Sequence, residues 1–190
     1  MRCIVSRKPK EYLKQSPIGC GAFSVKGILS AYGKDDKQRP FEYLPLGGIP
    51  FVLNISHWTN VLSSYGLPAE RCSLRGMPDK EKIRIIEDLL RLDTPVMLHI
   101  GNGYRGCGTW NALQWWLVDH WITLWGFDDE QKAFYIYDPG VPRHCYDANI
   151  PTGNVRRTYA QVLRDIRGGQ PWWQRYLYKK ISLPKDPLTK

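Results

Sequence analysis

The chain has 190 residues, of which 43% are apolar and 13% aromatic, and its formal net charge is +9 at pH 7. This composition excludes an intrinsically disordered protein, and the length suits one domain with its own core. No run of about 18 apolar residues occurs, and the N-terminus lacks the apolar segment of a secretory signal. We therefore expect a soluble single domain over residues 1–190, with its core over residues 12–183. It would be cytoplasmic, or exported without a cleavable signal peptide.

The N-terminal half has the spacing of helices. Apolar residues recur at helical intervals after Cys20, so a helix is expected to begin near Cys20 and to end at Gly33. A turn-rich connection follows over residues 34–50. Two further helices are predicted, at Ser56 to Tyr65 and at Lys80 to Arg91, the second with Asp79 as its N-cap.

The C-terminal half is richer in strands. A short buried strand is expected over residues 94–100, followed by a glycine-rich loop and a short helix over 110–116. A polar turn joins two strands, His120 to Phe127 and Ala133 to Tyr137, which predicts an antiparallel hairpin. A helix over 159–166 and a strand over 176–181 complete the chain. Helices that precede an antiparallel sheet indicate the α+β class.

The five cysteines form no CxxC pair, and their number is odd. In a chain without a secretory signal this pattern predicts reduced thiols. A zinc site needs two close pairs of ligands, and only His144 and Cys145 are adjacent, so no metal and no cofactor are expected.

Cys20 has the surroundings of a nucleophile. A helix N-terminus favours the thiolate form, and Cys20 is predicted to lie in the first turn of its helix. Gly19 and Gly21 flank it and leave room for a substrate carbonyl. The amide of Gln15, five residues earlier, is a candidate donor to an oxyanion, together with the backbone N–H of Cys20. A small buried thiol at a helix start is the simpler explanation for Cys20 alone.

His120 and Asp138 are predicted to meet. His120 opens the first strand of the hairpin and Asp138 ends the second, and these ends are adjacent in an antiparallel pair. A carboxylate beside an imidazole fixes its tautomer and stabilises its charged form. Taken singly, His120 also fits a strand histidine bonded to the backbone, and Asp138 fits a turn before Pro139 and Gly140.

Taken together, these residues resemble a known family. The three motifs are Gln15 separated by four residues from Cys20-Gly21-Ala22, the run His120 to Asp128, and the run Phe134 to Pro139. They resemble the bacteriocin-processing (double-glycine leader) peptidases of bacteria and their stand-alone relatives, which are papain-like cysteine peptidases. Phe127 stands where that family usually has tyrosine. The resemblance implies a papain-like fold and a thiol protease with a catalytic triad. Cys20 would be the nucleophile, His120 the base and acid, Asp138 the orienting acid and Gln15 an oxyanion donor.

Other functions remain open at this stage. A peptide or protein substrate is expected, but the same thiol chemistry would serve an acyltransferase or an exported toxin that attacks cell-wall peptides or host proteins. Residues 1–14 hold five basic and one acidic side chain, and residues 143–190 hold ten basic and three acidic. An inert basic module that binds an acidic partner through residues 143–190 is therefore a further alternative. A solvated surface explains this charge more simply, and nucleic acid is not expected.

Residues 101–106 match the glycine fingerprint GxGxxG and have Asp128 downstream, as in dinucleotide-binding domains. The antiparallel strands that follow argue against that fold, and a loop near the cleft is the preferred interpretation.

Three other histidines compete with His120 for the role of base. His57 and His99 fall in a predicted helix and a buried strand, which favours satisfied core histidines, while His144 is a possible accessory residue on a loop. The tryptophans over residues 110–125 are expected in the core and the cleft wall rather than in a base-stacking platform.

Overall fold

The computed structural model describes residues 1–16, 18–34, 37–45, 54, 56–105 and 107–182. Residues 35–36 and 46–50 of the predicted connection, and residues 183–190 at the end of the basic region, lie outside the described residues. None of the helices in the described ranges is both long and apolar enough to cross a bilayer. The elements follow one another along the chain as β1 (Arg2–Ile4), α1 (Cys20–Ala31), η1 (Pro40–Tyr43), α2 (His57–Ser64), β2 (Ala69–Ser73), α3 (Asp79–Arg91), β3 (Val96–Gly101), β4 (Tyr104–Arg105), β5 (Thr109–Trp110), α4 (Ala112–Leu117), β6 (Asp119–Asp128), β7 (Ala133–Tyr137), η3 (Arg143–Cys145), β8 (Val155–Thr158), α5 (Tyr159–Asp165), η4 (Trp172–Gln174) and β9 (Leu177–Ile181).

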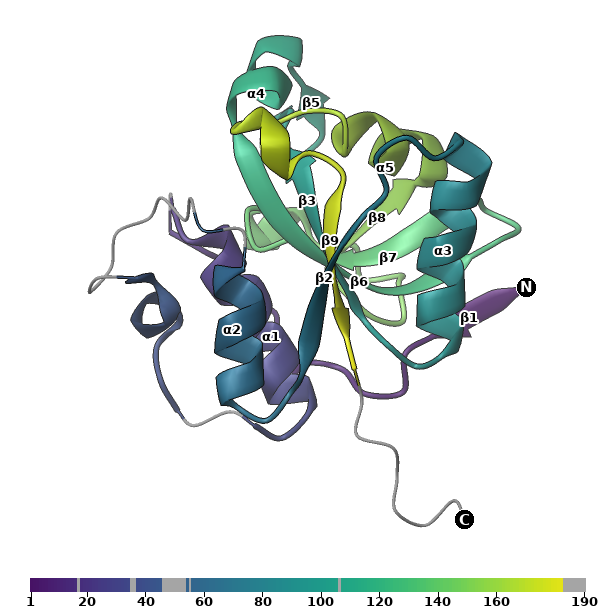
Figure 1. The fold of residues 1–190 in the computed structure, drawn as a ribbon. Helices are drawn as coiled ribbons and strands as arrows, with labels where there is room; N and C mark the ends of the chain where they lie inside the picture. The colour runs from purple at the N-terminus through teal and green to yellow at the C-terminus, as the bar shows by residue number, and fades with distance from the viewer. Residues whose placement is uncertain (17, 35–36, 46–53, 55, 106, 183–190) are drawn as a thin grey trace.

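One antiparallel sheet organises the molecule (Figure 1). Its strands run in the order β2-β9-β3-β6-β7-β8, and β1 joins it by pairing with the end of β6. The long strand β6 pairs with β3 on one edge and with β7 on the other. Because β7 runs antiparallel to β6, the start of β6 and the end of β7 lie at the same end of the sheet. The predicted α+β class is confirmed.

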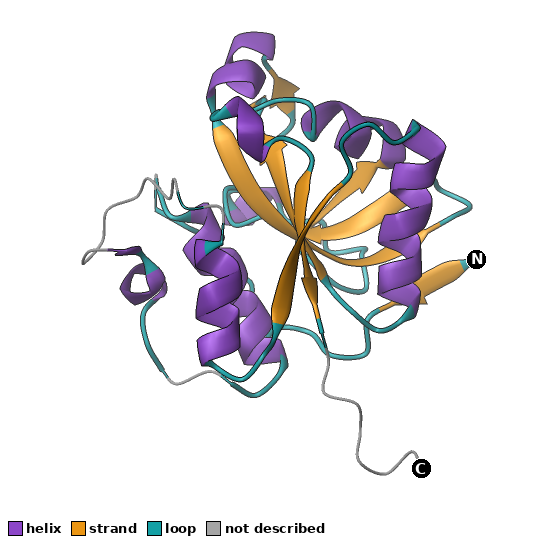
Figure 2. Cartoon of the chain, in the orientation of Figure 1, coloured by secondary structure: helices purple, strands orange, loops and turns teal. Residues whose placement is uncertain are grey.

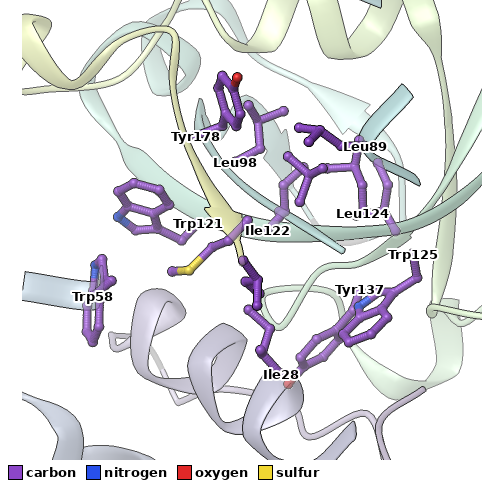
Figure 3. Packing of buried hydrophobic residues seen from close by; sticks show 14 of the residues in the cluster. Ile28, Trp58, Leu89, Leu98, Trp121, Ile122, Leu124, Trp125, Tyr137 and Tyr178 are labelled. Atoms are coloured by element: carbon purple, nitrogen blue, oxygen red, sulfur yellow. The ribbon is translucent and has the colours of Figure 1, made fainter. Parts of the chain in front are cut away.

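Helices cover both faces of this sheet (Figure 2). α1 packs against α2 and against β6, while α3 contacts β6 and β3. In the close view of the core, Ile28 of α1 lies on the same side of the strands as Trp125 and Tyr137, and Leu89 of α3 lies on the other side with Leu98 (Figure 3). All five side chains are buried. The core thus fixes α1 onto the face of β6.

Most predicted elements are present, with differences at the sheet edges. α1 begins at Cys20 as expected, and the hairpin of β6 and β7 is confirmed. Pro78, rather than Asp79, is the N-cap of α3. Within the predicted loop over residues 101–108 lies the strand β4, which pairs with β5 in a short hairpin. The edge strands β2 and β8 are polar and lack clear apolar alternation, so the sequence did not indicate them.

The packing of α1 on the sheet can be tested by truncating Leu29. This side chain is 0% exposed, so we expect Leu29→Ala to lower the free energy of unfolding by about 2–5 kcal/mol. Leu92, at the end of α3, is 70% exposed and supplies a matched control, because Leu92→Ala should change stability by less than about 0.5 kcal/mol. Denaturant titration measures both values. Equal effects of the two substitutions would contradict this arrangement.

Candidate active site

Cys20 is the first residue of α1. Gly19 precedes it with φ 103° and ψ 17°, a left-handed conformation that suits glycine and turns the chain into the helix. The first backbone N–H groups of a helix have no partner within it and carry its positive partial charge. Cys20 is a half-buried free cysteine. Because it begins the helix, its sulfur lies where a negative charge is favoured.

Gly21 owes its identity to packing against α2. A Cβ added at Gly21 would lie 2.3 Å from two ring carbons of Trp58, closer than real contacts allow. Trp58 is itself buried in the core. The structure therefore explains Gly21 by the close approach of α1 and α2, whereas the sequence suggested space for a substrate carbonyl.

His120 and Asp138 form a direct contact in the interior. His120 is the second residue of β6 and Asp138 immediately follows β7, as the hairpin predicts. The ring Nε2 of His120 lies 2.7 Å from Oδ1 of Asp138. Each side chain is 2% exposed, so water does not screen the interaction. The predicted contact between His120 and Asp138 is therefore present in the structure.

The charges of this pair stabilise each other. Burial by itself lowers the pKa of His120, but the charge of Asp138 and hydrogen bonds to Asp138 and Cys20 outweigh it and raise that pKa to about 10. Burial by itself raises the pKa of Asp138, yet the charges of His120 and Arg157 hold it well below its usual range. In the neutral range the pair is therefore an imidazolium and a carboxylate.

The Cys20 thiol reaches the same imidazole from α1. The Cys20 side chain interacts with the same imidazole and helps to raise its pKa, while Asp138 occupies the ring Nε2. One turn along α1, the buried Oγ of Ser24 donates to the backbone oxygen of Trp121, at 3.1 Å. This bond fastens α1 to β6 next to His120. Three distant stretches of chain thus bring a thiol, an imidazole and a carboxylate into one line of contacts.

Three residues that the sequence analysis did not single out hold Asp138 in place. The backbone N–H of Gly140 donates to Asp138 Oδ1 at 2.8 Å, so the turn after β7 also supports the carboxylate. The Asn154 side chain accepts from the backbone N–H of Asp138 and donates to its carbonyl oxygen, both at 2.8 Å. The buried Arg157 guanidinium donates to Asp138 Oδ2. Neither Asn154 nor Arg157 lies in a motif that identifies such a role.

Gln15 is brought to the edge of this arrangement. Its backbone N–H donates to the carbonyl oxygen of Pro139 at 2.8 Å, which ties the segment before α1 to the residue after Asp138. The Gln15 side chain is half-buried. Its Oε1 has no hydrogen-bond partner among the described residues. The Gln15 side chain thus lies next to the site, and no hydrogen bond to its amide oxygen from the described residues holds it in place.

The other histidines lie elsewhere. His57 begins α2 and its Nε2 pairs with the backbone oxygen of Tyr43 at 2.7 Å, as expected of a satisfied histidine. His99 is buried in β3 as predicted, but neither ring nitrogen has a hydrogen-bond partner within the described part of the chain. Burial, followed by the charges of His120, Lys179 and Arg175, lowers the pKa of His99 to about 3, so it is neutral.

The expectation of five reduced thiols is wrong. Cys107 and Cys145 form a disulfide that joins the β4–β5 turn to η3, while Cys3, Cys20 and Cys72 are free. The two sulfurs and a ring nitrogen of His144 lie within 4.8 Å of one another. Because thiolates are the ligands that zinc takes from cysteine, the disulfide leaves this group without them. The spacing of the cysteines along the chain gave no sign of the pair.

Packing explains the first two glycines of the fingerprint, while Gly106 lies outside the described residues. A Cβ at Gly101 would lie 2.2 Å from the carbonyl oxygen of Trp115, and one at Gly103 would lie 2.4 Å from the Trp110 ring nitrogen. The strands on both sides of β3 are antiparallel, unlike those of a dinucleotide-binding unit. The tryptophans divide between core and surface, since Trp121 and Trp125 are buried while Trp116 is exposed.

Comparison with known proteins establishes the fold. No family model and no curated protein matches the chain. Among solved structures, a double glycine motif protease from an AMS/PCAT transporter, in complex with the leader peptide, is 18% identical with a TM-score of 0.56, over 96% of this chain and 99% of that one. A structure described as a C39-like peptidase from Bacillus anthracis is 13% identical with a TM-score of 0.58, over 98% and 100%.

UfSP from C. elegans is also similar, at 16% identity and a TM-score of 0.52. The match covers 98% of this chain but only 34% of UfSP, so it is confined to one part of that protein. The fold of this chain is therefore that of papain-like cysteine peptidases, as the sequence motifs implied. Activity and substrate do not follow from a fold alone.

The charge of His120 has a consequence for stability. A histidine whose folded pKa exceeds its unfolded value of about 6.5 stabilises the protein fully below pH 6.5, and this contribution is lost as pH rises toward the folded pKa. Between pH 6.5 and 9 we expect the free energy of unfolding of the wild type to fall, relative to His120→Gln, by at most about 1.4 kcal/mol per pH unit. Urea titrations at several pH values measure it. Parallel curves for the two proteins would show that His120 is not held charged.

Proposed function

We propose that this protein is a cysteine-dependent hydrolase that cleaves a peptide or amide bond, with Cys20 as nucleophile. The observation that carries the proposal is the line of contacts from Cys20 to His120 to Asp138, placed at a helix N-terminus. The papain-like fold supports it, because the solved structures of similar fold are described as a protease and a C39-like peptidase. Nucleophilic catalysis needs a thiolate, a base and a group that orients the base, and each has a candidate here.

In the first half of the reaction, the Cys20 thiolate attacks the substrate carbonyl carbon. The carbonyl π electrons move to oxygen, and the resulting oxyanion is stabilised by the backbone N–H of Cys20 and by the Gln15 amide. His120 then gives a proton to the nitrogen of the scissile bond. That bond breaks, the amine leaves, and an acyl thioester on Cys20 remains. Asp138 keeps the His120 ring oriented throughout.

In the second half, His120 removes a proton from water as the water oxygen attacks the thioester carbon. The carbon–sulfur bond breaks, the carboxylic acid leaves, and the thiolate–imidazolium pair is restored. If an amine or alcohol arrives in place of water, the same intermediate gives an acyltransferase. Hydrolysis and transfer therefore share every residue of the site and differ in the second nucleophile.

A peptide with apolar side chains is the substrate class that the surroundings favour. Ile18, two residues before Cys20, is exposed, and Phe41 packs close to Gly19. On the sheet side, Trp116 and Val118 of the segment before His120 are exposed as well. Exposed apolar side chains close in sequence to Cys20 and to His120 are suited to contact apolar residues of an extended chain. The double glycine motif protease of similar fold was solved with a leader peptide.

The alternative of an inert basic module has no support from the contacts. Several arginines in residues 143–190 are engaged within the protein: Arg157 with Asp138, Arg167 with Asp79, and Arg156 with Asp147. The charge of this region is thus partly neutralised internally. An exported toxin would use the same site. That alternative therefore differs in the location of the substrate and not in the chemistry.

The reactivity of Cys20 gives a test that needs no substrate. At pH 6–7 we expect iodoacetamide to modify Cys20 faster than Cys3 and Cys72, because the imidazolium of His120 stabilises the thiolate. His120→Ala should slow modification of Cys20 by at least about tenfold. Peptide mapping by mass spectrometry follows each thiol separately. Equal rates for the three free thiols, or a rate for Cys20 that His120→Ala leaves unchanged, would count against the proposal.

Turnover tests the roles of the supporting residues. The folded full-length protein is incubated with a proteome-derived peptide mixture, and new termini are identified by mass spectrometry. Cys20→Ala should abolish all cleavage that the wild type performs. On a peptide selected in this way, Gln15→Ala should lower kcat by about 10²–10³-fold, since it removes one oxyanion donor. A Cys20→Ala protein that yields the same new termini as the wild type would refute Cys20 as nucleophile.

A further inference from the structure

Arg157 is a charged side chain placed inside the protein. It lies in the edge strand β8, where its neighbour Arg156 is exposed and Arg157 itself is only 5% exposed. The alternation of strand side chains between two faces sends these adjacent arginines in opposite directions. A guanidinium does not lose its proton in a protein, so a buried one requires anionic partners.

Arg157 has carboxylates on two sides. Its Nη2 donates to Oδ2 of Asp138, and its Nη1 lies 3.8 Å from Oδ2 of Asp165 in α5. The Asp165 side chain is 0% exposed and also pairs with Arg164, at 2.9 Å. The ring of Tyr104, from β4, lies 4.3 Å from the Arg157 guanidinium carbon and covers it. The position of this guanidinium is therefore set by Asp138 and by two elements outside the catalytic strands, α5 and β4.

These contacts continue the line of catalytic groups. Each residue of the series interacts with the next one. When Cys20 is a thiolate, the charges of the successive residues alternate in sign. From the cysteine outward the series is Cys20, His120, Asp138, Arg157, Asp165 and Arg164. Alternation means that every buried charge in the middle of the series has an opposite charge on both sides, which offsets the cost of removing it from water.

We propose that Arg157 is a positioning residue for the reaction, which holds the Asp138 carboxylate ionised with Oδ1 directed at His120. This inference rests on the proposed function of Cys20 and His120. The two carboxylate oxygens of Asp138 have separate partners: Oδ1 accepts from Gly140 and faces His120, while Oδ2 accepts from Arg157. Fixing Oδ2 prevents the carboxylate from rotating away from the imidazole.

Loss of Arg157 would expose the Asp138 charge to the full effect of burial. The charged groups around Asp138 are His120 on one side and Arg157 on the other, with Asp165, Arg164 and Tyr104 beyond Arg157. Without the guanidinium, the charge of His120 opposes burial with less support, so the pKa of Asp138 rises toward its usual range. Once protonated, the carboxyl can donate a hydrogen bond and no longer stabilises the imidazolium. Modification of Cys20 that depends on this imidazolium would then require a higher pH than in the wild type.

The experiment is the pH profile of Cys20 modification by iodoacetamide between pH 4 and 8, on the full chain. We expect Arg157→Gln to move the acid limb of the profile upward by at least about one pH unit. Arg157→Lys keeps the positive charge and should restore at least half of that shift. Arg156→Gln makes the same chemical change at the exposed neighbour and should leave the profile as in the wild type.

The outcomes separate this inference from the proposed function. Selective labelling of wild-type Cys20 together with an unshifted profile in folded Arg157→Gln would overturn the role of Arg157 and leave the hydrolase proposal intact. A wild type without selective labelling would count against the hydrolase itself. Should Arg157→Gln fail to fold, the double variant Arg157→Gln/Asp165→Asn keeps the core charge balanced, and an unshifted profile there would be equally contrary. A pH profile of Arg157→Lys that is shifted as far as that of Arg157→Gln would also contradict the proposed role of Arg157.

Discussion

The site depends on the contact between His120 and Asp138, a charged imidazole and a carboxylate that are both removed from water. Taking each ion out of solvent costs several kcal/mol, and their attraction offsets that cost only with close geometry and further hydrogen bonds. Both conditions are met, by the 2.7 Å separation and by donors from Gly140 and Arg157 to the carboxylate. The pair is then stable as ions, and the imidazole has one orientation and one charge state in which to meet a thiol.

The fold supplies this contact by two routes of different range. His120 and Asp138 are 18 residues apart and meet through the pairing of β6 with β7, which is local and robust. Cys20 arrives from a helix that begins a hundred residues before His120. It is placed by the core between α1 and the sheet and by the bond from Ser24 to Trp121. The helix that carries the sulfur therefore depends on packing, whereas the imidazole and its acid depend on hydrogen bonding within the sheet.

This difference explains what the sequence could and could not predict. Cys20 at a helix start and the His120–Asp138 pair were predictable, because helix periodicity and hairpin pairing are local patterns. Arg157 was not, since a charged residue on a polar edge strand has the sequence of a solvated surface, and only the tertiary structure turns it inward. The Cys107–Cys145 disulfide was not predicted for a similar reason: its partners are 38 residues apart, one in the β4–β5 turn and one in the short η3. Long-range contacts made by irregular or polar segments leave no local pattern.

The central claim is that a buried acid keeps the His120 ring charged opposite the thiol. The ¹⁵N resonances of the His120 ring report its protonation directly, and a His120→Gln protein assigns them. At pH 7 and 8 we expect an imidazolium with both nitrogens protonated, because Asp138 raises the affinity of the ring for its second proton. A neutral ring with one protonated nitrogen at pH 7 would contradict it, and would leave Cys20 beside a histidine with no charge to stabilise a thiolate.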